Sequence, residues 1–275
     1  MSKTKLLLLS ILNFFFAGNS YSAGAKPWQT GFQESASPAA TMIIDTHNFI
    51  MMFVWVIVAL VLLLLVFTCI KFRAKNNPVP STTSHHTLLE IIWIVIPTII
   101  VIIIAIPSVK LILKQDTLPK TEMTLKVIGR QWYWSYEYPD HNNIAFDSYM
   151  KKDEELLPKD KRLLSTDNKV VLPVETYIKV QITSSDVIHA WAIPALGIKK
   201  DAVPGRLNEI WMYIEKPGTY YGQCSELCGI LHAFMPIEIK AVSKENFKKW
   251  VTKASKEFAY DTHSILLANN NNEEK

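Results

Sequence analysis

The sequence is poor in cysteine and lacks the motifs that cysteine most often builds. Its 275 residues hold three cysteines, Cys69, Cys224 and Cys228, which are too few for a disulfide-rich scaffold. No Cys-x-x-Cys-His motif occurs, which excludes a covalently attached c-type haem. The net charge is only +4 without a strongly basic domain, so no nucleic-acid partner is indicated. With 49% hydrophobic and 20% charged residues, the composition is not that of a disordered chain.

The small positive charge lies in the first part of the chain, beside apolar runs. Residues 1–115 carry a balance of +5 and residues 116–275 a balance of −1. The chain starts with Lys3 and Lys5, an apolar stretch at 6–16 and then small residues, which predicts a secretory signal peptide over 1–25. The predicted cleavage sites follow Ser22, Ala23 or Ala25. A short interfacial helix is the alternative, because a bilayer span needs about 20 apolar residues.

Two longer apolar runs, at 49–70 and 88–113, predict a pair of membrane-spanning helices. A basic cluster at 71–75 directly follows the first run, and positive residues beside a span favour the cytoplasmic side. The loop 71–87 is therefore expected in the cytoplasm. The segment 26–48 and the long C-terminal region are expected outside, in agreement with an export signal.

Residues 114–265 predict an exported all-β domain. Short β-type segments are separated by turn signals, and a helical period appears only at 243–260. The predicted strands are Met123–Val127, Gln131–Tyr138, Lys169–Leu172, Thr176–Thr183, Leu207–Ile214 and Met235–Val242. This pattern indicates a β-sandwich or barrel with a terminal helix. Residues 266–275 are polar and are predicted to form a tail.

Sulfur and imidazole donors gather near the end of this domain. Cys224, Cys228, His232 and Met235 lie within twelve residues, and His189 stands upstream. Soft sulfur ligands combined with imidazole suit copper, zinc or iron–sulfur sites. A chain with this donor set is therefore a candidate metal protein.

Three interpretations of these donors remain open. The two cysteines can form a structural disulfide, or two Cys and two His can bind a structural zinc ion. Met235 argues against zinc, which seldom takes a thioether ligand. A blue-copper site uses one Cys, two His and a weak Met, and this chain has one further Cys. Two bridging thiolates can hold two copper ions close together, so a dinuclear copper centre is the third interpretation.

Four motifs resemble one protein family. CSELCGILHAFM at 224–235 is similar to the dinuclear copper A motif of subunit II of haem–copper cytochrome c oxidases. IHAWAIPALGIKKDAVPGRLNE at 188–209 and GRQWYWSYEY at 129–138 resemble further signatures of that family, with Arg130 where a His is common, and GFQESASP at 31–38 matches as well. The resemblance implies a hairpin of two transmembrane α-helices and an exported cupredoxin-like barrel or sandwich.

The resemblance also implies a set of metal ligands. By position, the ligands of copper A are His189, Cys224, Cys228, His232, Met235 and the carbonyl of Glu226. The side chain of Glu226 is implied to reach a magnesium ion at the boundary with subunit I, and hard Mg²⁺ prefers such oxygen ligands. A simple hydrogen bond to a neighbour is the alternative for this side chain.

Further residues match positions with roles in electron and proton transfer. Trp132 matches the tryptophan that receives the electron, although packing across a strand also explains it. Glu90 matches a carboxylate at the mouth of a proton channel of subunit I, and a solvated acid at a membrane boundary is the alternative. An acidic patch steers a basic partner such as cytochrome c, although an ordinary solvated surface also explains single acids. The matching or nearby acids are Glu137, Asp140, Asp147, Asp167 and Asp186.

The implied function is that of the electron-accepting subunit of a proton-pumping respiratory oxidase. Cytochrome c is the implied donor. Subunit I, with haem a and haem a3–copper B, is implied to reduce oxygen to water, and subunit III and membrane lipid are further partners. A quinol oxidase subunit lacks these ligands, a nitrous oxide reductase needs a second histidine-rich cluster, and a copper carrier leaves the tryptophan-rich strand unexplained. The export-type signal favours a bacterial inner membrane with the copper domain in the periplasm over a mitochondrial inner membrane.

Overall fold

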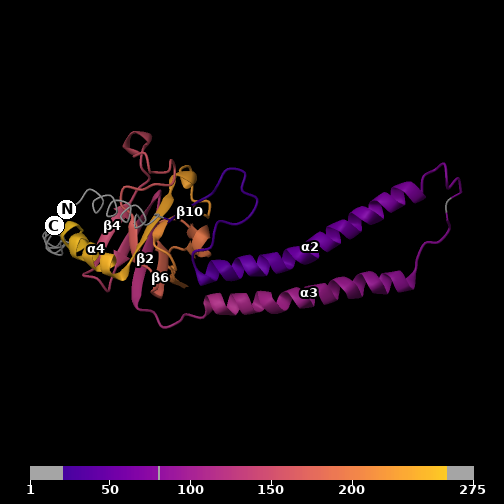
Figure 1. Ribbon diagram of the computed structural model, residues 1–275, viewed down its shortest axis with the longest axis horizontal. Helices are drawn as coiled ribbons and strands as arrows, with labels where there is room; N and C mark the ends of the chain where they lie inside the picture. The colour runs from indigo at the N-terminus through magenta and orange to yellow at the C-terminus, as the bar shows by residue number, and fades with distance from the viewer. Residues whose placement is uncertain (1–20, 80, 259–275) are drawn as a thin grey trace, which may run out of the picture. The chain divides into compact units, whose positions relative to one another are not determined.

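The computed structural model describes residues 21–79 and 81–258, which form two compact units (Figure 1). One unit comprises residues 41–117, and the other comprises the chain up to Ala40 together with the chain from Leu118 onwards. Most of the predicted signal peptide, residues 1–20, and the predicted polar tail, 266–275, lie outside the described residues. The boundaries predicted for those two segments therefore stay predictions.

Two long helices make up the smaller unit. Helix α2 spans Pro38–Lys71 and helix α3 spans Thr87–Asp116, and each contains one of the predicted apolar runs. Both are long and apolar enough to cross a membrane, and their large apolar side chains are exposed. Helix α2 extends eleven residues before the run at 49–70, and α3 extends only a few residues beyond 88–113.

The residues up to Ala40, which include the first turn of α2, belong to the larger unit and contact its β domain. Ser37 accepts a hydrogen bond from the backbone N–H of Ala40 at 3.0 Å and donates its hydroxyl to the carbonyl of Leu196 at 2.7 Å. Gly197 lies against this first turn with φ at +64°, and a Cβ there would come within 2.7 Å of the Ala40 nitrogen. Only glycine allows both that backbone conformation and that approach. Pro38 at the first helical position suits the helix start as well.

Helix α3 begins with a cap that includes the predicted proton-channel acid. Glu90 accepts a hydrogen bond from the backbone N–H of His86 at 3.3 Å, and His86 Nδ1 accepts one from the backbone N–H of Leu89 at 3.4 Å. This reciprocal arrangement satisfies two N–H groups near the helix start. Glu90 therefore has a structural partner, whatever further role it has.

The larger unit is a sandwich of two β-sheets, with α4 (Lys244–Glu257) following the last strand. In one sheet the order is β5 (Val170–Pro173), β11 (Pro236–Val242), β10 (Gly218–Cys224), β7 (His189–Ile193) and β8 (Ile198–Ala202), and the short β1 (Tyr21–Ala23) pairs with β10. In the other sheet the order is β4 (Ile144–Ser148), β3 (Tyr133–Tyr138), β2 (Met123–Arg130), β6 (Ile178–Ser184) and β9 (Asn208–Met212). Three 3-10 turns complete the domain: η1 (Asp153–Glu155), η2 (Pro194–Leu196) and η3 (His232–Phe234).

The core between the sheets is rich in aromatic side chains. Trp134, Tyr136 and Tyr138 point inward from alternate positions of β3, as the period of a strand requires, and all three are fully buried. The indole of Trp191 in the opposite sheet donates to the Tyr136 hydroxyl at 3.3 Å. Trp250 of α4 also packs on Tyr138, with the two ring centroids 5.1 Å apart. The predicted fold class, two apolar helices and a β-sandwich with a terminal helix, is confirmed.

The topology brings several strand ends to one end of the sandwich. Strands β2 and β6 are parallel with Gly129 opposite Ser184, so the segments that follow both strands start side by side. Strands β10 and β7 are antiparallel with Cys224 opposite Trp191, so the end of β10 reaches the start of β7. These pairings place residues 131–132, 186–189 and 224–235 close together.

Candidate metal centre

Thiol and imidazole groups lie together at this end of the sandwich. The sulfurs of Cys224 and Cys228 are 3.8 Å apart. His189 Nδ1 lies 3.9 Å from the Cys224 sulfur, and His232 Nδ1 lies 3.5 Å from the Cys228 sulfur. His189 and both cysteines are buried, and within the described parts of the chain they form a group whose ligand atoms all lie within 4.8 Å of one another.

The spacing of these atoms fits metal ligation. Metal–sulfur and metal–nitrogen bonds of about 2.3 and 2.0 Å put the ligand atoms of one tetrahedral ion roughly 3.5–4 Å apart. The S–S and S–N distances match that value. Both thiols are free, and the S–S distance is far from the roughly 2.05 Å of a disulfide. An imidazole nitrogen thus lies within 3.9 Å of the Cys224 sulfur and another within 3.5 Å of the Cys228 sulfur.

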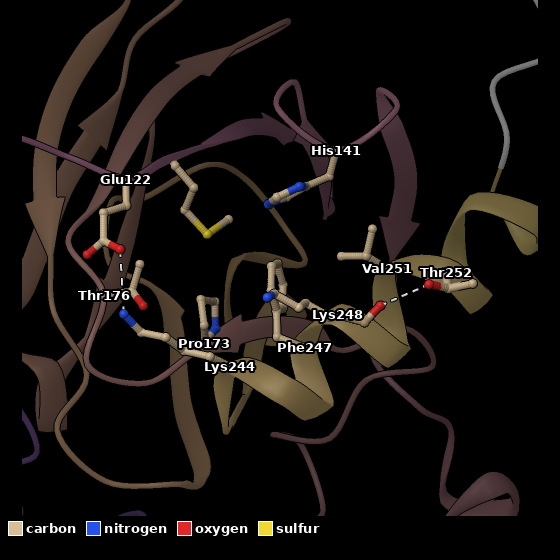
Figure 2. Close-up of a pocket in the computed structure, with 10 residues that line it drawn as sticks. Glu122, His141, Pro173, Thr176, Lys244, Phe247, Lys248, Val251 and Thr252 are labelled. Atoms are coloured by element: carbon tan, nitrogen blue, oxygen red, sulfur yellow. Dashed lines mark hydrogen bonds and ion pairs between the residues drawn. The ribbon is translucent and has the colours of Figure 1, made fainter.

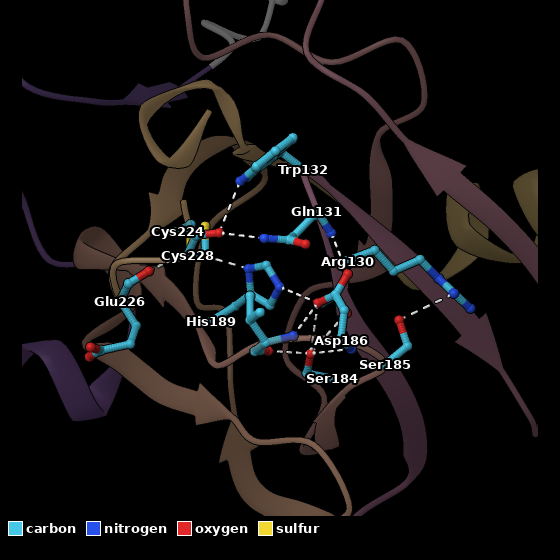
Figure 3. Close-up of polar contacts among 12 residues, drawn as sticks. Arg130, Gln131, Trp132, Ser184, Ser185, Asp186, His189, Cys224, Glu226 and Cys228 are labelled. Atoms are coloured by element: carbon cyan, nitrogen blue, oxygen red, sulfur yellow. Dashed lines mark hydrogen bonds and ion pairs between the residues drawn. The ribbon is translucent and has the colours of Figure 1, made fainter. Parts of the chain in front are cut away.

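Two weaker donors border the sulfur pair. The carbonyl oxygen of Glu226 lies 3.3 Å from the Cys224 sulfur, while the Glu226 carboxylate points away from the cluster (Figure 3). Met235 is buried with 1% of its surface exposed, and its carbonyl accepts hydrogen bonds from the backbone N–H of Cys224 at 3.0 Å and the indole of Trp134 at 3.4 Å. These contacts of its carbonyl place the Met235 backbone beside the cysteine loop.

Hydrogen bonds fix the orientation of His189. Its Nε2–H donates to Asp186 at 2.8 Å, which leaves Nδ1 free to face the Cys224 sulfur. Asp186 also accepts hydrogen bonds from the backbone N–H groups of Val187 and Gln131, both at 2.6 Å (Figure 3). Behind the ring, a Cβ on Gly129 would lie 2.8 Å from His189 Cδ2. The absence of a side chain at Gly129 therefore makes room for the imidazole.

Electrostatics at the cluster follow from burial and from these contacts. Burial alone would raise the pKa of Cys224, but hydrogen bonds with His189 and with the backbone bring it below its ordinary value. Burial and the neighbouring charge of Cys224 raise the pKa of Cys228. Burial opposes a charged His189, yet its contacts with Cys224 and Asp186 raise its pKa. The pair of thiols thus gives up its first proton readily, and a cation bound between them would favour loss of the second.

Trp132 lies next to the cluster. Its indole N–H donates to the carbonyl of Cys228 at 3.1 Å, and the Gln131 side chain donates to the same oxygen at 2.9 Å (Figure 3). Trp132 is half-buried, whereas Trp134, two positions along the chain, is fully buried in the core. Gly229 allows the close approach of this indole, because a Cβ there would lie 3.0 Å from Trp132 Cζ2 and the residue has φ at +118°.

Comparison with known proteins relates these observations to one family. The family described as cytochrome C oxidase subunit II, periplasmic domain, matches residues 123–242, and that described as the transmembrane domain of the same subunit matches residues 25–111. A probable cytochrome c oxidase subunit 2 of Rickettsia bellii is 52% identical over 254 residues, which cover 92% of this chain and 94% of that protein. The chain belongs to the cytochrome c oxidase subunit II family. Its two helices and its β-sandwich correspond to the two matched domains of that subunit.

Other relatives of this subunit II sequence come from further organisms. The cytochrome c oxidase subunit 2 of Oenothera berteroana is 49% identical over 234 residues, or 83% of this chain and 91% of that protein. Among solved structures, the periplasmic domain of subunit II of cytochrome oxidase from Bradyrhizobium japonicum is 54% identical, covers 52% of this chain and 100% of that domain, and gives a TM-score of 0.49.

The structure places the predicted thiol and imidazole donors and the Glu226 carbonyl close together, with the Met235 backbone next to Cys224, but it gives the predicted docking acids different surroundings. Glu137 forms an ion pair with Lys126 at 2.9 Å, and Asp140 accepts a hydrogen bond from the backbone N–H of Thr124 at 2.6 Å. Asp147 accepts from the Ser135 hydroxyl at 2.6 Å. All three remain partly or largely exposed on this family member.

The remaining two acids differ from each other. Asp167 is exposed and accepts hydrogen bonds from the backbone N–H groups of Tyr149 and Asn168 at 2.8 and 2.6 Å. Asp186 instead contacts His189, and hydrogen bonds from His189, Val187 and Gln131 outweigh burial and lower its pKa. Asp186 is therefore part of the support of the cluster.

Sequence reasoning missed two residues of the site, Gln131 and Gly129. Gln131 donates one hydrogen bond to the Cys228 carbonyl and another to Asp186, and so connects the cysteine loop with the support of His189. Gly129 makes room for the His189 ring. Their position in GRQWYWSYEY, directly before Trp132, was the one available signal, and it indicates no role without the three-dimensional contacts.

We predict that Asp186→Asn damages the centre itself more than partner binding. Both carboxylate oxygens accept hydrogen bonds from N–H donors, so an amide NH₂ at either position faces a donor and moves His189 or Gln131. Loss of such a support typically lowers metal affinity or activity about 10–100-fold. For the electron-accepting copper centre proposed below, kcat for the oxidation of cytochrome c is expected to fall and the copper spectrum to shift.

The control for this prediction is Asp147→Asn, which keeps an oxygen acceptor for Ser135 outside the cluster. It is expected to leave the copper spectrum unchanged. A change in KM alone for Asp186→Asn, with an unaltered spectrum, would return Asp186 to the docking surface.

Proposed function

We propose that this chain receives electrons from reduced cytochrome c at a dinuclear copper A centre and delivers them to haem a of subunit I, as part of an oxidase that reduces oxygen to water and pumps protons. The observation that carries the proposal is the pair of free, buried sulfurs 3.8 Å apart, each with an imidazole Nδ1 of its own. Two thiolates and two imidazoles are soft and borderline donors that suit copper.

The residues that would hold the two copper ions have distinct tasks. Cys224 and Cys228 would supply thiolate sulfurs to the copper ions, and His189 and His232 would supply imidazole nitrogens. Met235 and the Glu226 carbonyl are the weaker donors at the border of the cluster. When bound, the copper pair supplies reversible one-electron redox chemistry. The protein holds the donors in place beforehand, because Asp186 and Gly129 fix His189 and the Gln131 and Trp132 side chains fix the Cys228 carbonyl.

Trp132 is proposed to receive the electron from the docked cytochrome. Its ring is half-buried and thus reachable from solvent, and its N–H is one hydrogen bond from the backbone of a ligand residue. The indole π-system in this position lies between the protein surface and the cluster, so an electron that passes through it has few gaps between atoms to cross. The next residue in the chain, Tyr133, stacks on Tyr149 with their ring centroids 4.4 Å apart.

The acids Glu137, Asp140, Asp147 and Asp167 are proposed to steer basic cytochrome c. Their carboxylates keep exposed surface even though each has an intramolecular partner, and long-range attraction depends on charge more than on a free oxygen. The intramolecular partners of these four carboxylates hold the negative charges in position. Asp186 contributes a negative charge to the same field but has the structural task described above.

We predict that Glu137→Gln with Asp167→Asn weakens association with cytochrome c while kcat stays unchanged. Both replacements keep an oxygen acceptor, so the local hydrogen bonds survive. KM is expected to rise roughly tenfold at low ionic strength and much less at high salt, because salt screens exposed charges. The control is Glu257→Gln on α4, another exposed acid. Equal losses at all ionic strengths would contradict steering.

Two further assignments concern the boundary with subunit I. The Glu226 carboxylate is exposed and points away from the sulfurs, so it is available to a hard cation such as Mg²⁺ while its carbonyl faces the cluster (Figure 3). Glu90 is proposed at the mouth of a proton channel of subunit I. Its partner, the His86 backbone N–H, holds the carboxylate at the start of α3 and leaves one oxygen for a proton.

We propose a bacterial inner membrane as the location, with the copper domain in the periplasm and the loop between α2 and α3 in the cytoplasm. The basic residues after α2 support this orientation. In a Cys69→Ser background, we predict that Ser81→Cys in the loop resists an impermeant thiol reagent in intact spheroplasts, whereas Glu154→Cys in the β domain reacts. Reaction at position 81 from the outside would reverse the topology.

The test of the proposed function is copper analysis combined with electron paramagnetic resonance on the purified oxidase. Two coppers bound by this chain and a hyperfine pattern of one unpaired electron shared by two nuclei are expected. A single copper with the spectrum of an isolated ion, or zinc in its place, would contradict the proposal.

A further inference from the structure

A second site lies at the other end of the sandwich from the cluster. Met123 starts β2 and Arg130 ends it, and an eight-residue strand is about 23 Å long. At the Met123 end, a pocket of about 410 Å³ opens between α4, the turn after β3 and the loop at residues 173–176 (Figure 2). This volume lies in the range of small-molecule sites, and nothing in the proposed electron transfer uses the pocket.

A buried polar atom in this pocket has no partner. His141 points into the pocket from the β3–β4 turn, and its Nε2 is buried without a hydrogen bond in the part of the chain that the structure describes (Figure 2). The ring packs edge-on against Phe247 with centroids 5.2 Å apart, so it is held in that direction. Buried polar atoms are nearly always hydrogen-bonded, and an exception asks for an explanation. A ligand that hydrogen-bonds to His141 Nε2 is such an explanation.

The charged side chains around the pocket sum to one positive charge. Lys244 and Glu122 form an ion pair at 3.5 Å at one side. Lys248, one turn further along α4, also lines the pocket, and its ammonium makes no ion pair with any of the described residues. A single negative charge on a ligand would balance Lys248.

The rest of the wall is apolar. Met123, Pro173, Phe247 and Val251 line this part of the pocket, and Met123 and Phe247 are 5 and 6% exposed. A small inorganic anion would leave these side chains facing water, and an apolar molecule would leave Lys248 and His141 unpaired. A ligand that fits has an apolar body and one anionic head.

We propose that this pocket binds a small amphipathic monocarboxylate. The carboxylate pairs with Lys248 and accepts a hydrogen bond from His141 Nε2–H, and the apolar body lies against Met123, Phe247 and Val251. The contact is reversible binding without a chemical step. It goes beyond the proposed function, because the pocket and the metal cluster share no residue.

The probe for this proposal is octanoate with a photoreactive diazirine at its apolar end, added to the purified oxidase in lipid nanodiscs. After irradiation, peptide mass spectrometry is expected to find the label on α4 near Val251. Unlabelled octanoate is expected to compete, and octan-1-ol, which has the chain without the charge, is not. Val251→Trp, which fills the apolar part, is expected to abolish the label.

Adjacent lysines on α4 supply a matched pair of variants. Lys248→Gln removes the charge at the pocket and is expected to raise the octanoate concentration needed for half-competition about tenfold. Lys249→Gln removes the next charge, which pairs with Glu245 away from the pocket, and is expected to change it by no more than about twofold. His141→Phe keeps the ring contact but removes Nε2, and is expected to weaken competition as well.

Three results would overturn the site: no label on α4, equal competition by octan-1-ol and octanoate, or unchanged competition in Lys248→Gln. Each variant is first checked for its haem spectrum and for cytochrome c oxidation, which are expected to match wild type. Lys248 is exposed, so its replacement is compatible with folding and the test stays decisive even if Val251→Trp fails to assemble.

Discussion

Serine in place of Cys228 or Cys224 is expected to destroy the proposed dinuclear copper centre. A hydroxyl has nearly the shape of a thiol, so the fold around these buried positions survives, but it does not ionise readily and does not bridge two soft ions. Because loss of a supporting residue already costs up to about 100-fold, loss of a bridging ligand is expected to lower cytochrome c oxidation by at least that factor. Copper content and the paramagnetic spectrum of the purified oxidase measure the effect.

The matched control for this prediction is Cys69→Ser. Cys69 is exposed on α2 and has no part in the cluster, so this variant is expected to keep both coppers and full activity. If either serine variant at 224 or 228 kept two coppers and an unchanged spectrum, the bridging assignment would be wrong.

Replacement of the thioether gives a graded comparison. Met235→Leu conserves volume in a buried position, which typically costs less than about 1.5 kcal/mol of stability. Because the thioether is a weak ligand, this variant is expected to retain copper and to change its spectrum and potential before its content. Greater loss of copper in Met235→Leu than in Cys228→Ser would contradict the proposed ligand roles.

The parts of the fold that the sequence predicts are those with a strong repeating pattern. The apolar runs predicted both long helices, and β2, β6 and β11 were found because apolar residues recur along them. Strands β7 and β10 were missed because nearly every residue of HAWAI and GTYYGQC is buried, so neither alternates between polar and apolar. The β8 sequence, IKKDA, is dominated by charged residues, which strands generally disfavour.

The metal site also has one part that the local sequence predicts and another that it does not. Five of its predicted donors follow one another within 224–235, so the motif alone indicates them, and His189 was predicted through its own signature. The contact between Gln131 and Asp186 joins residues 55 positions apart and arises only because β2 and β6 run parallel. No local pattern carries that information, and for this reason Asp186 was first interpreted as a docking residue alone.

Replacement of Trp132 by phenylalanine is expected to separate docking from electron transfer. An aromatic ring remains, and Gln131 still donates to the Cys228 carbonyl, although the indole atoms Cζ2 and Nε1 that approach Gly229 are lost. The indole N–H that contacts this carbonyl at 3.1 Å is lost, along with part of the π-surface. Affinity for cytochrome c is expected to stay near wild type, because charge holds the partner. Reduction of copper A is expected to slow by orders of magnitude, and transfer from copper to haem a to stay unchanged.

Rapid kinetics with photoreduced cytochrome c, following copper A and haem a separately, tests each of these expectations. Trp250→Phe on α4 makes the same chemical change outside the site and is expected to leave all rates at wild type. The two nearby tyrosines differ as alternatives, because Tyr136 is fully buried in the core whereas Tyr133 is half-buried and stacks on exposed Tyr149. If copper A reduction in Trp132→Phe stayed as fast as wild type at saturating cytochrome c, Trp132 would be abandoned as the receiving residue. Tyr133 would then take its place, since an electron from a docked partner must enter through a side chain that the partner can approach.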